Sequence, residues 1–198
     1  MLTPGHVNQA DYSNIKNKLL IYGKHRVNLP VKKWTGQHGP HSKRQHMNGM
    51  HFEEFEAGQE FEHPIRRTVT EMDNTLFSSL TYNPQPLHID RHYCETQTEF
   101  GQPLMNSYFT LGLMVGIAVS DITLGTTIAN LGMTEVRFPA PVFHGDTLHI
   151  ATKVLGKRES KSRPDAGIVE FQHEAFNQDD TLVAICIRQV FMRKKQAA

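Results

Sequence analysis

The chain has 198 residues, a formal net charge of +1 and a hydrophobic fraction of 38%, which fits one domain of ordinary size, with or without an appendage. No apolar run approaches the roughly 18–20 residues of a membrane span, and the N-terminus lacks the apolar core and cleavage site of a secretory signal. The composition includes two cysteines, Cys94 and Cys186, which excludes a disulfide scaffold and favours a reducing, cytoplasmic compartment.

Residues 1–49 are basic and show no sustained period of 2 or 3.6. They hold eight lysines and arginines against one acid, and five of the 12 histidines. Three interpretations stay open: a solvated or partner-wrapping arm, an organelle-targeting sequence, or translation from a start codon upstream of the true one. The histidines lack regular ligand spacing and the basic residues are not interleaved with aromatics, so neither a metal site nor nucleic-acid binding is favoured.

A structured domain is expected over residues 50–198. "HFEEFEAGQEF" predicts a short segment ending in a turn, and "HPIRRTVT" has the character of a strand. "TEMDNTLFSSLTY" predicts a helix that begins with a capping box of Thr70 and Asp73. Its apolar residues at helical spacing are Met72, Leu76, Phe77 and Leu80. A loop containing "TYNPQPLHID" follows, in which Asp90 either orients His88 or caps a short helix that begins near His92.

The run "PLMNSYFTLGLMVGIAVSDI" is apolar almost all round and predicts a long buried helix. Its Gly112 and Gly116 either let a neighbouring backbone approach closely or only lower helix stability. Four segments then read as strands: "TIANLGMTEVRFPAPV", "TLHIATKVLGKR", "IVEFQHEAFNQ" and "TLVAICIRQVFMRK". Consecutive strands joined by tight turns predict an antiparallel meander, so the expected fold class is α+β, one long central helix wrapped by a curved antiparallel sheet.

Three motifs, which follow one another along the chain in the same order as in that family, resemble the MaoC-like hydratases, which have the hot-dog fold. "VRFPAPVFHGDTL" is similar to their signature F-x-x-P-V-x-P-G-D-T-L, and "FGQPLMNSYFTLGL" to the start of their helix, G-x-P-I-A-H-G-M-L-T. "PLHID" matches the end of S-G-D-x-N-P-L-H-x-D. The resemblance covers roughly residues 50–195, and "TVTEMDNTLFSSLTYNPQPLHID" looks closest to the mesaconyl-CoA and itaconyl-CoA hydratase-like group.

The resemblance implies a role for single positions. The motif histidine is His88, and Asn83 stands where the family has its aspartate. Gln85 replaces the motif asparagine, and Asn106 replaces a histidine at the start of the helix. Ser107 replaces the glycine whose backbone N–H serves as the family's oxyanion donor.

Hydration of an enoyl thioester needs a base for water, an acid for the α-carbon and donors for the thioester oxygen. His88 is the motif residue that shuttles protons near neutral pH, and Ser107 keeps its N–H despite the loss of glycine. Asn83 can position water but cannot take its proton. We therefore expect His88, Asn83 and Ser107 to be catalytic, with Gln85 and Asn106 beside the substrate. The alternatives are that His88 is only a hydrogen-bonded loop histidine and that Ser107 only begins a helix, where serine is common.

Basic residues are candidates for binding the anionic parts of a substrate. Arg67, or its neighbour Arg66, is placed to pair with a carboxylate of a dicarboxylic enoyl-CoA, which the neutral Asn83 would not repel. In "GKRESKSRPDAG", Arg158, Lys161 and Arg163, together with Lys157, are candidates for the phosphates of coenzyme A. The alternative in each case is a solvated surface charge.

The leading hypothesis is a hydro-lyase that hydrates a short, dicarboxylic enoyl-CoA, with coenzyme A as part of the substrate and no metal or redox cofactor. Alternatives are a hot-dog acyl-CoA thioesterase, disfavoured because "MNSYFTLGLM" has no acid, and a non-catalytic acyl-CoA-binding module, favoured by Asn83. Action on a carrier-protein substrate also stays open. The resemblance implies a homodimer or larger homo-oligomer, and neither nucleic acid nor membrane is an expected partner.

Overall fold

The computed structural model describes residues 49–196. Except for Gly49, the arm predicted at residues 1–49 lies outside the described residues. The three interpretations of this arm therefore stay predictions. The backbone N–H groups of Gly49 and Met50 donate to the carbonyls of Leu124 and Ile122. The described chain therefore starts against the segment that follows the central helix. Within residues 49–196, none of the helices is long and apolar enough to cross a membrane.

The first part of the domain is a string of short elements. A 3₁₀ helix, η2 (Phe52–Glu54), is followed by β1 (Glu60–Glu62), β2 (Arg67–Thr68) and the helix α2 (Glu71–Leu80). The capping box predicted for α2 is confirmed, because the Thr70 hydroxyl accepts from the N–H of Asp73 and the Asp73 carboxylate accepts from the N–H of Thr70.

The apolar residues of α2 do not form its buried face. Its buried residues are Asn74 and Ser78, whereas Met72, Leu76 and Leu80 are 71%, 53% and 77% exposed. Helical spacing fixes which side chains share a face but not which way that face points. In a single chain the apolar stripe of α2 therefore faces outward.

The stretch "TYNPQPLHID" was expected to be a loop, and the structure corrects this. Its second half forms one helical turn, α3 (Pro86–Ile89), which starts at a proline, the residue whose missing N–H costs nothing at that position. Asp90 caps the next helix, α4 (Arg91–Gln97), by accepting a 2.9 Å hydrogen bond from the N–H of Tyr93. The capping role proposed for Asp90 is therefore confirmed.

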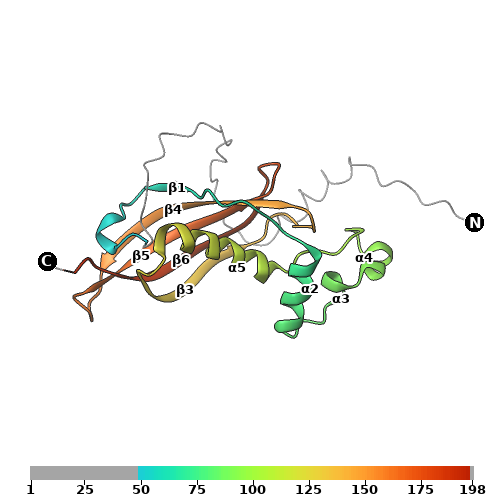
Figure 1. The fold of residues 1–198 in the computed structure, drawn as a ribbon, viewed down its shortest axis with the longest axis horizontal. Helices are drawn as coiled ribbons and strands as arrows, with labels where there is room; N and C mark the ends of the chain where they lie inside the picture. Colours follow the sequence, from blue (N-terminus) through green and yellow to red (C-terminus); the bar gives the residue numbers. More distant parts are fainter. Residues whose placement is uncertain (1–48, 197–198) are drawn as a thin grey trace, which may run out of the picture. The chain divides into compact units, whose positions relative to one another are not determined.

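The central helix is α5 (Ser107–Ala118), which continues into a π-helical turn, η3 (Val119–Thr123). It packs on the sheet strands β4, β5 and β6, and Figure 1 shows it lying across the concave side of the curved sheet. One stripe of α5 is exposed, including Tyr108, Gly112 and Gly116, so burial all round does not hold within one chain. A Cβ on either glycine would meet no atom of the described residues within 4 Å.

The sheet is antiparallel and consists mainly of four long strands. These are β3 (Thr127–Arg137), β4 (Thr147–Glu159), β5 (Ala166–Phe176) and β6 (Leu182–Arg193). The spatial order is β1-β4-β5-β6-β3, with β2 also pairing with β4. The meander is confirmed for β4 to β6. Strand β3 pairs with β6 instead of its sequence neighbour β4, which corrects the expected order.

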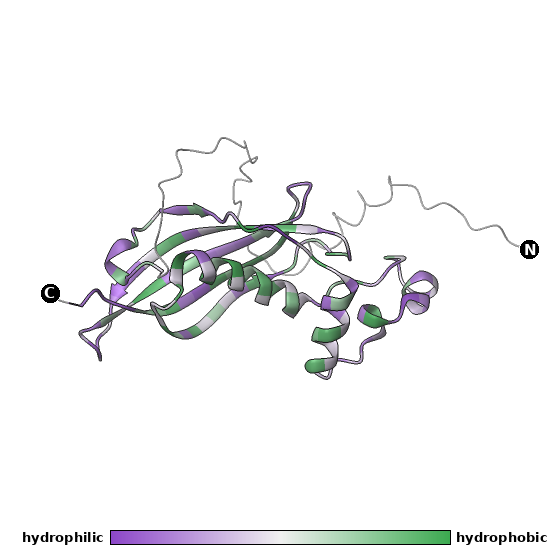
Figure 2. Cartoon of the chain, in the orientation of Figure 1, coloured by the Kyte–Doolittle hydropathy of each residue, from purple (hydrophilic) through white to green (hydrophobic). Residues whose placement is uncertain are grey.

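The core lies between α5 and the sheet. Buried residues alternate along β4, β5 and β6, as expected where one face of a sheet is covered. Met114 and Ile117 of α5 pack on Ile150 and Ala184 in the larger cluster, and Figure 2 shows the apolar colouring of α5 and the strands beneath it. One helix wrapped by a curved antiparallel sheet is the hot-dog fold, so the predicted fold class is confirmed.

Candidate active site

Asn74 of α2 is a fully buried residue that joins three segments around the start of α5. Its side-chain amide nitrogen donates to the carbonyls of His88 and Leu104 at 2.7 and 2.8 Å. Its Oδ1 accepts a 2.8 Å hydrogen bond from the backbone N–H of Asn106. Asn74 was not expected at the site from the sequence. A signal was present, since asparagine is a poor helix former in mid-helix unless its side chain bonds elsewhere.

His88 lies on α3, half-buried, with its ring orientation fixed. Its Nδ1 is 3.0 Å from the carbonyl oxygen of Leu104. A carbonyl only accepts, so Nδ1 carries the hydrogen, and in the neutral ring Nε2 carries the lone pair. Among the described residues Nε2 has no hydrogen-bond partner. The ring is therefore arranged as a proton acceptor through Nε2.

The start of α5 presents unpaired backbone donors. Asn106 is the N-cap residue, and its side chain accepts from the N–H of Tyr108 at 3.0 Å. The N–H of Ser107, the first residue of the helix, has no partner among residues 49–196. Such N–H groups carry the partial positive charge of the helix terminus. The geometry at Ser107 thus fits an anion-stabilising donor, while Asn106 acts on the helix itself.

Asn83 and Gln85 form a tight turn between α2 and α3. The Oδ1 of Asn83 accepts a 3.2 Å hydrogen bond from the backbone N–H of Gln85, and the N–H of Asn83 donates to the carbonyl of Ser78 at 2.8 Å. This leaves the Asn83 side-chain NH₂ without a partner among the described residues. The side chain can therefore still donate to a water molecule or a substrate oxygen.

His144, in the turn "FHGD" between β3 and β4, also lies against Asn74. Its Nε2 is 3.1 Å from the Asn74 amide nitrogen. An amide nitrogen only donates, so His144 Nε2 accepts here and shares one of the two amide hydrogens with a carbonyl, and the neutral ring carries its hydrogen on Nδ1. Burial lowers the pKa of His144, which agrees with that neutral form. His144 was not expected at the site from the sequence, and it stands where the strand–turn–strand signature has proline.

The arginine expected to hold a substrate carboxylate is already paired. Arg67 makes a 2.5 Å contact from its guanidinium to the carboxylate of Asp73 and lies over the ring of Phe109. Its neighbour Arg66 contacts Nδ1 of His149 at 3.5 Å. The role of Arg67 in substrate binding stays a prediction, and any incoming carboxylate there would compete with Asp73.

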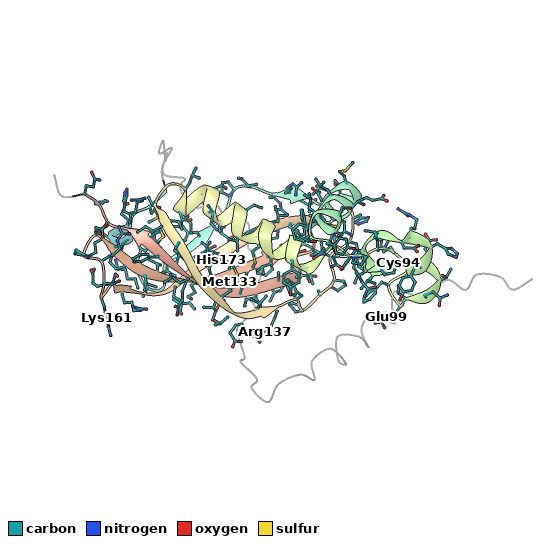
Figure 3. All side chains as sticks on the ribbon, turned by 90° about the horizontal axis from the view of Figure 1, so that it is seen from below. Cys94, Glu99, Met133, Arg137, Lys161 and His173 are labelled. Carbon is teal, nitrogen blue, oxygen red and sulfur yellow. The ribbon has the colours of Figure 1, made fainter. Side chains whose placement is uncertain are left out.

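The basic residues expected at coenzyme A phosphates are not brought to His88 within one chain. Arg158 is the penultimate residue of β4. Lys161 and Arg163 lie in the β4–β5 hairpin, where Arg163 pairs with Asp165. Figure 3 shows Lys161 at one end of the sheet and Cys94, whose sulfur lies 3.4 Å from the carbonyl of Leu87 in α3, at the other. Their phosphate-binding role stays a prediction.

Comparisons with known proteins identify relatives of this chain. Residues 53–175 match the family described as MaoC like domain. The chain is 36% identical to the β-methylmalyl-CoA dehydratase of Chloroflexus aurantiacus over 74% of this chain and 41% of that protein. It is 31% identical to the mesaconyl-CoA hydratase of Cereibacter sphaeroides over 76% of this chain and 43% of that protein. It therefore spans about four tenths of the length of these two relatives.

A solved structure matches this chain along the whole of its own length. The MaoC-like dehydratase from Rhodospirillum rubrum superposes with a TM-score of 0.66 and 28% identity, over 75% of this chain and 100% of that one.

Proposed function

Because this chain belongs to the MaoC-like family, we propose that it catalyses the reversible addition of water to the double bond of an enoyl-CoA thioester. The proposal is carried by one observation. Asn74 bonds both the carbonyl of His88 and the N–H of Asn106, the residue directly before Ser107. One buried side chain thus fixes the proton acceptor and the start of α5 relative to each other, as a two-part catalytic site requires.

The proposed mechanism uses groups in these positions. His88 Nε2 takes a proton from water as its oxygen attacks the β-carbon, and the resulting imidazolium returns a proton to the α-carbon. The N–H of Ser107 stabilises the negative charge that develops on the thioester oxygen. Asn83 donates its free NH₂ to the attacking water and holds it in place. Coenzyme A is part of the substrate, and the proposal needs no metal or redox cofactor.

We further propose that the acyl group is short and carries a second carboxylate. Two relatives are named for β-methylmalyl-CoA and mesaconyl-CoA, which are dicarboxylic thioesters. An aspartate at position 83 would repel such a carboxylate by roughly 4 kcal/mol at about 4 Å and an effective dielectric constant near 20. The neutral amide of Asn83 removes this repulsion.

The protein is proposed to act as a homodimer. A single chain exposes the apolar stripe Met72, Leu76 and Leu80 on α2. It also leaves β3 at the edge of the sheet, with Leu131 and Val136 50% and 39% exposed. Long edges and contiguous apolar surfaces are features that an interface covers. The exposed stripe of α5 with Gly112 and Gly116 adds to this surface.

The proposal is tested by adding crotonyl-CoA, mesaconyl-CoA or itaconyl-CoA separately to the purified protein and following the loss of enoyl-thioester absorbance. His88→Ala is expected to lower kcat on the order of 10²–10⁴-fold while its thermal unfolding remains like that of the wild type. A parallel assay for free coenzyme A thiol separates hydration from thioester hydrolysis. If folded protein turns over none of the three substrates, the hydratase proposal fails and a binding module becomes the better explanation.

A further inference from the structure

Arg188 of β6 is a buried cation without a counterion. Its side chain is 3% exposed, and its Nε and one terminal nitrogen have no hydrogen-bond partner. No carboxylate among residues 49–196 forms an ion pair with it. The guanidinium lies 5.9 Å from the ring centroid of Phe171, its neighbour across the β5–β6 ladder. Burial lowers the pKa of Arg188, as expected for a cation that lacks a counterion.

A second unpaired nitrogen lies in the same region. His173 of β5 stacks on Phe171, with ring centroids 5.7 Å apart, and its Nε2 is buried without a partner. Figure 3 shows His173 midway along the sheet, together with Met133, the residue that pairs with Arg188 in the β3–β6 ladder. Two buried polar groups on adjacent strands are thus left unsatisfied beside one aromatic ring.

A hydrogen-bond chain fixes the ring of His173 in this position. Its Nδ1 is 2.8 Å from the hydroxyl of Thr152, which is 2.7 Å from Nε2 of His63. The other ring nitrogen of His63 lies 2.8 Å from the carboxylate of Asp121 in η3. The Asp121 carboxylate only accepts, so His63 Nδ1 carries a hydrogen. When His63 carries both ring hydrogens, its Nε2 donates to Thr152, Thr152 donates to Nδ1 of His173, and His173 Nε2 is then an N–H donor at the end of the chain.

Unsatisfied buried groups of this kind are costly, because a charge removed from water needs a partner of opposite sign. The described residues supply none, so the partner expected from the chemistry is an anion that enters with a ligand. A carboxylate has two oxygens and matches the fork of a guanidinium, with further acceptor capacity for an N–H of His173.

We propose that Arg188 and His173 bind the terminal carboxylate of a dicarboxylic acyl thioester whose reacting end lies at the start of α5. This inference rests on the proposed function and names the residues that select its substrate. Ala184, four residues before Arg188 on β6, packs in one cluster with Met105, which directly precedes Asn106. Four strand residues span about 13 Å, which is the separation along β6 between Ala184 and Arg188. The side chain of Arg188 and a short acyl chain together are long enough to bridge this separation.

The test compares Arg188→Met and Arg188→Lys with Arg193→Met, a control on the exposed end of the same strand. Arg188→Met is expected to lower kcat/KM for mesaconyl-CoA on the order of 100-fold and to leave the turnover of crotonyl-CoA, which has no second carboxylate, unchanged. Because the substitution removes an unpaired buried charge, the Tm of the ligand-free protein should stay the same or rise. Arg188→Lys should recover part of the loss. Arg193→Met should behave as the wild type in every assay.

A binding readout separates this inference from the proposed function. Mesaconate, the free dicarboxylic acid, should raise the Tm of the wild type and of Arg193→Met but not of Arg188→Met. Hydration with unchanged substrate preference in Arg188→Met would overturn the inference and leave the hydratase proposal standing. A large fall in Tm without ligand would instead assign Arg188 a structural role. Protection by mesaconate that depends on Arg188, without any hydration, would support the subsite and refute the proposed reaction.

Discussion

Asn74→Ala should be one of the most damaging single changes in the domain. The substitution leaves the carbonyls of His88 and Leu104 and the N–H of Asn106 without the partner that now lies 2.7–2.8 Å away. The Leu104 carbonyl keeps a donor in His88 Nδ1, so two groups are left unsatisfied. At about 1–3 kcal/mol for each, the loss should be about 2–6 kcal/mol. Such a loss removes much of a total stability of about 5–15 kcal/mol.

The measurement is urea-induced unfolding of wild type, Asn74→Ala and the control Asn83→Ala, read by far-ultraviolet circular dichroism. Asn83 is partly exposed and accepts one hydrogen bond within its own turn, so its loss should cost less than about 1 kcal/mol. The activity of folded Asn74→Ala should also fall, because α3 and the start of α5 lose their common anchor. A destabilisation below about 1 kcal/mol with normal turnover would refute the role assigned to Asn74.

Three further predictions concern stability and assembly. Burial holds the pKa of His173 well below its ordinary value of 6.5. As pH drops from about 7.5 to 5.5, the unfolded chain therefore binds more protons than the folded chain, and the stability and Tm of the protein fall. His173→Gln should make Tm depend less on pH over this range. Gly167→Ala should lower the free energy of unfolding by about 1–3 kcal/mol, because the new Cβ would lie 2.2 Å from the ring of Phe52. The control Gly156→Ala, whose Cβ would enter open space, should change it by less than about 0.5 kcal/mol. Leu80→Lys places a charge in the proposed interface and should shift the mass measured by light scattering towards the monomer; an unchanged dimer would exclude this face of α2.

Much of the fold could be predicted because its signals are local. The capping box before α2, the apolar run of α5 and the alternation in β4 to β6 each depend on residues a few positions apart. What the sequence did not determine is which way a face points and which strands pair. The outward stripe of α2 and the pairing of β3 with β6 both depend on contacts between distant segments.

The same division holds at the site. His88 and Ser107 could be proposed from the sequence because each belongs to a short motif, and in the structure both adjoin segments held by Asn74. Asn74 itself was missed, because its partners lie 14, 30 and 32 positions away in the chain. Arg188 was missed for a different reason. A single arginine in an apolar strand resembles a surface charge until its burial is known.

The position of β3 has a consequence for how the chain folds. Strands β4, β5 and β6 follow one another through short turns, so their ladders close small loops, while Thr127 of β3 must find Met192 with both other strands between them in the chain. Closing a longer loop costs more conformational entropy, and this entropy is lost before the stabilising contacts form. Pairing between strands distant in the chain therefore slows folding. Three register shifts also interrupt the β3–β6 ladder. The meander should therefore assemble first, and the edge strand should dock last and detach first.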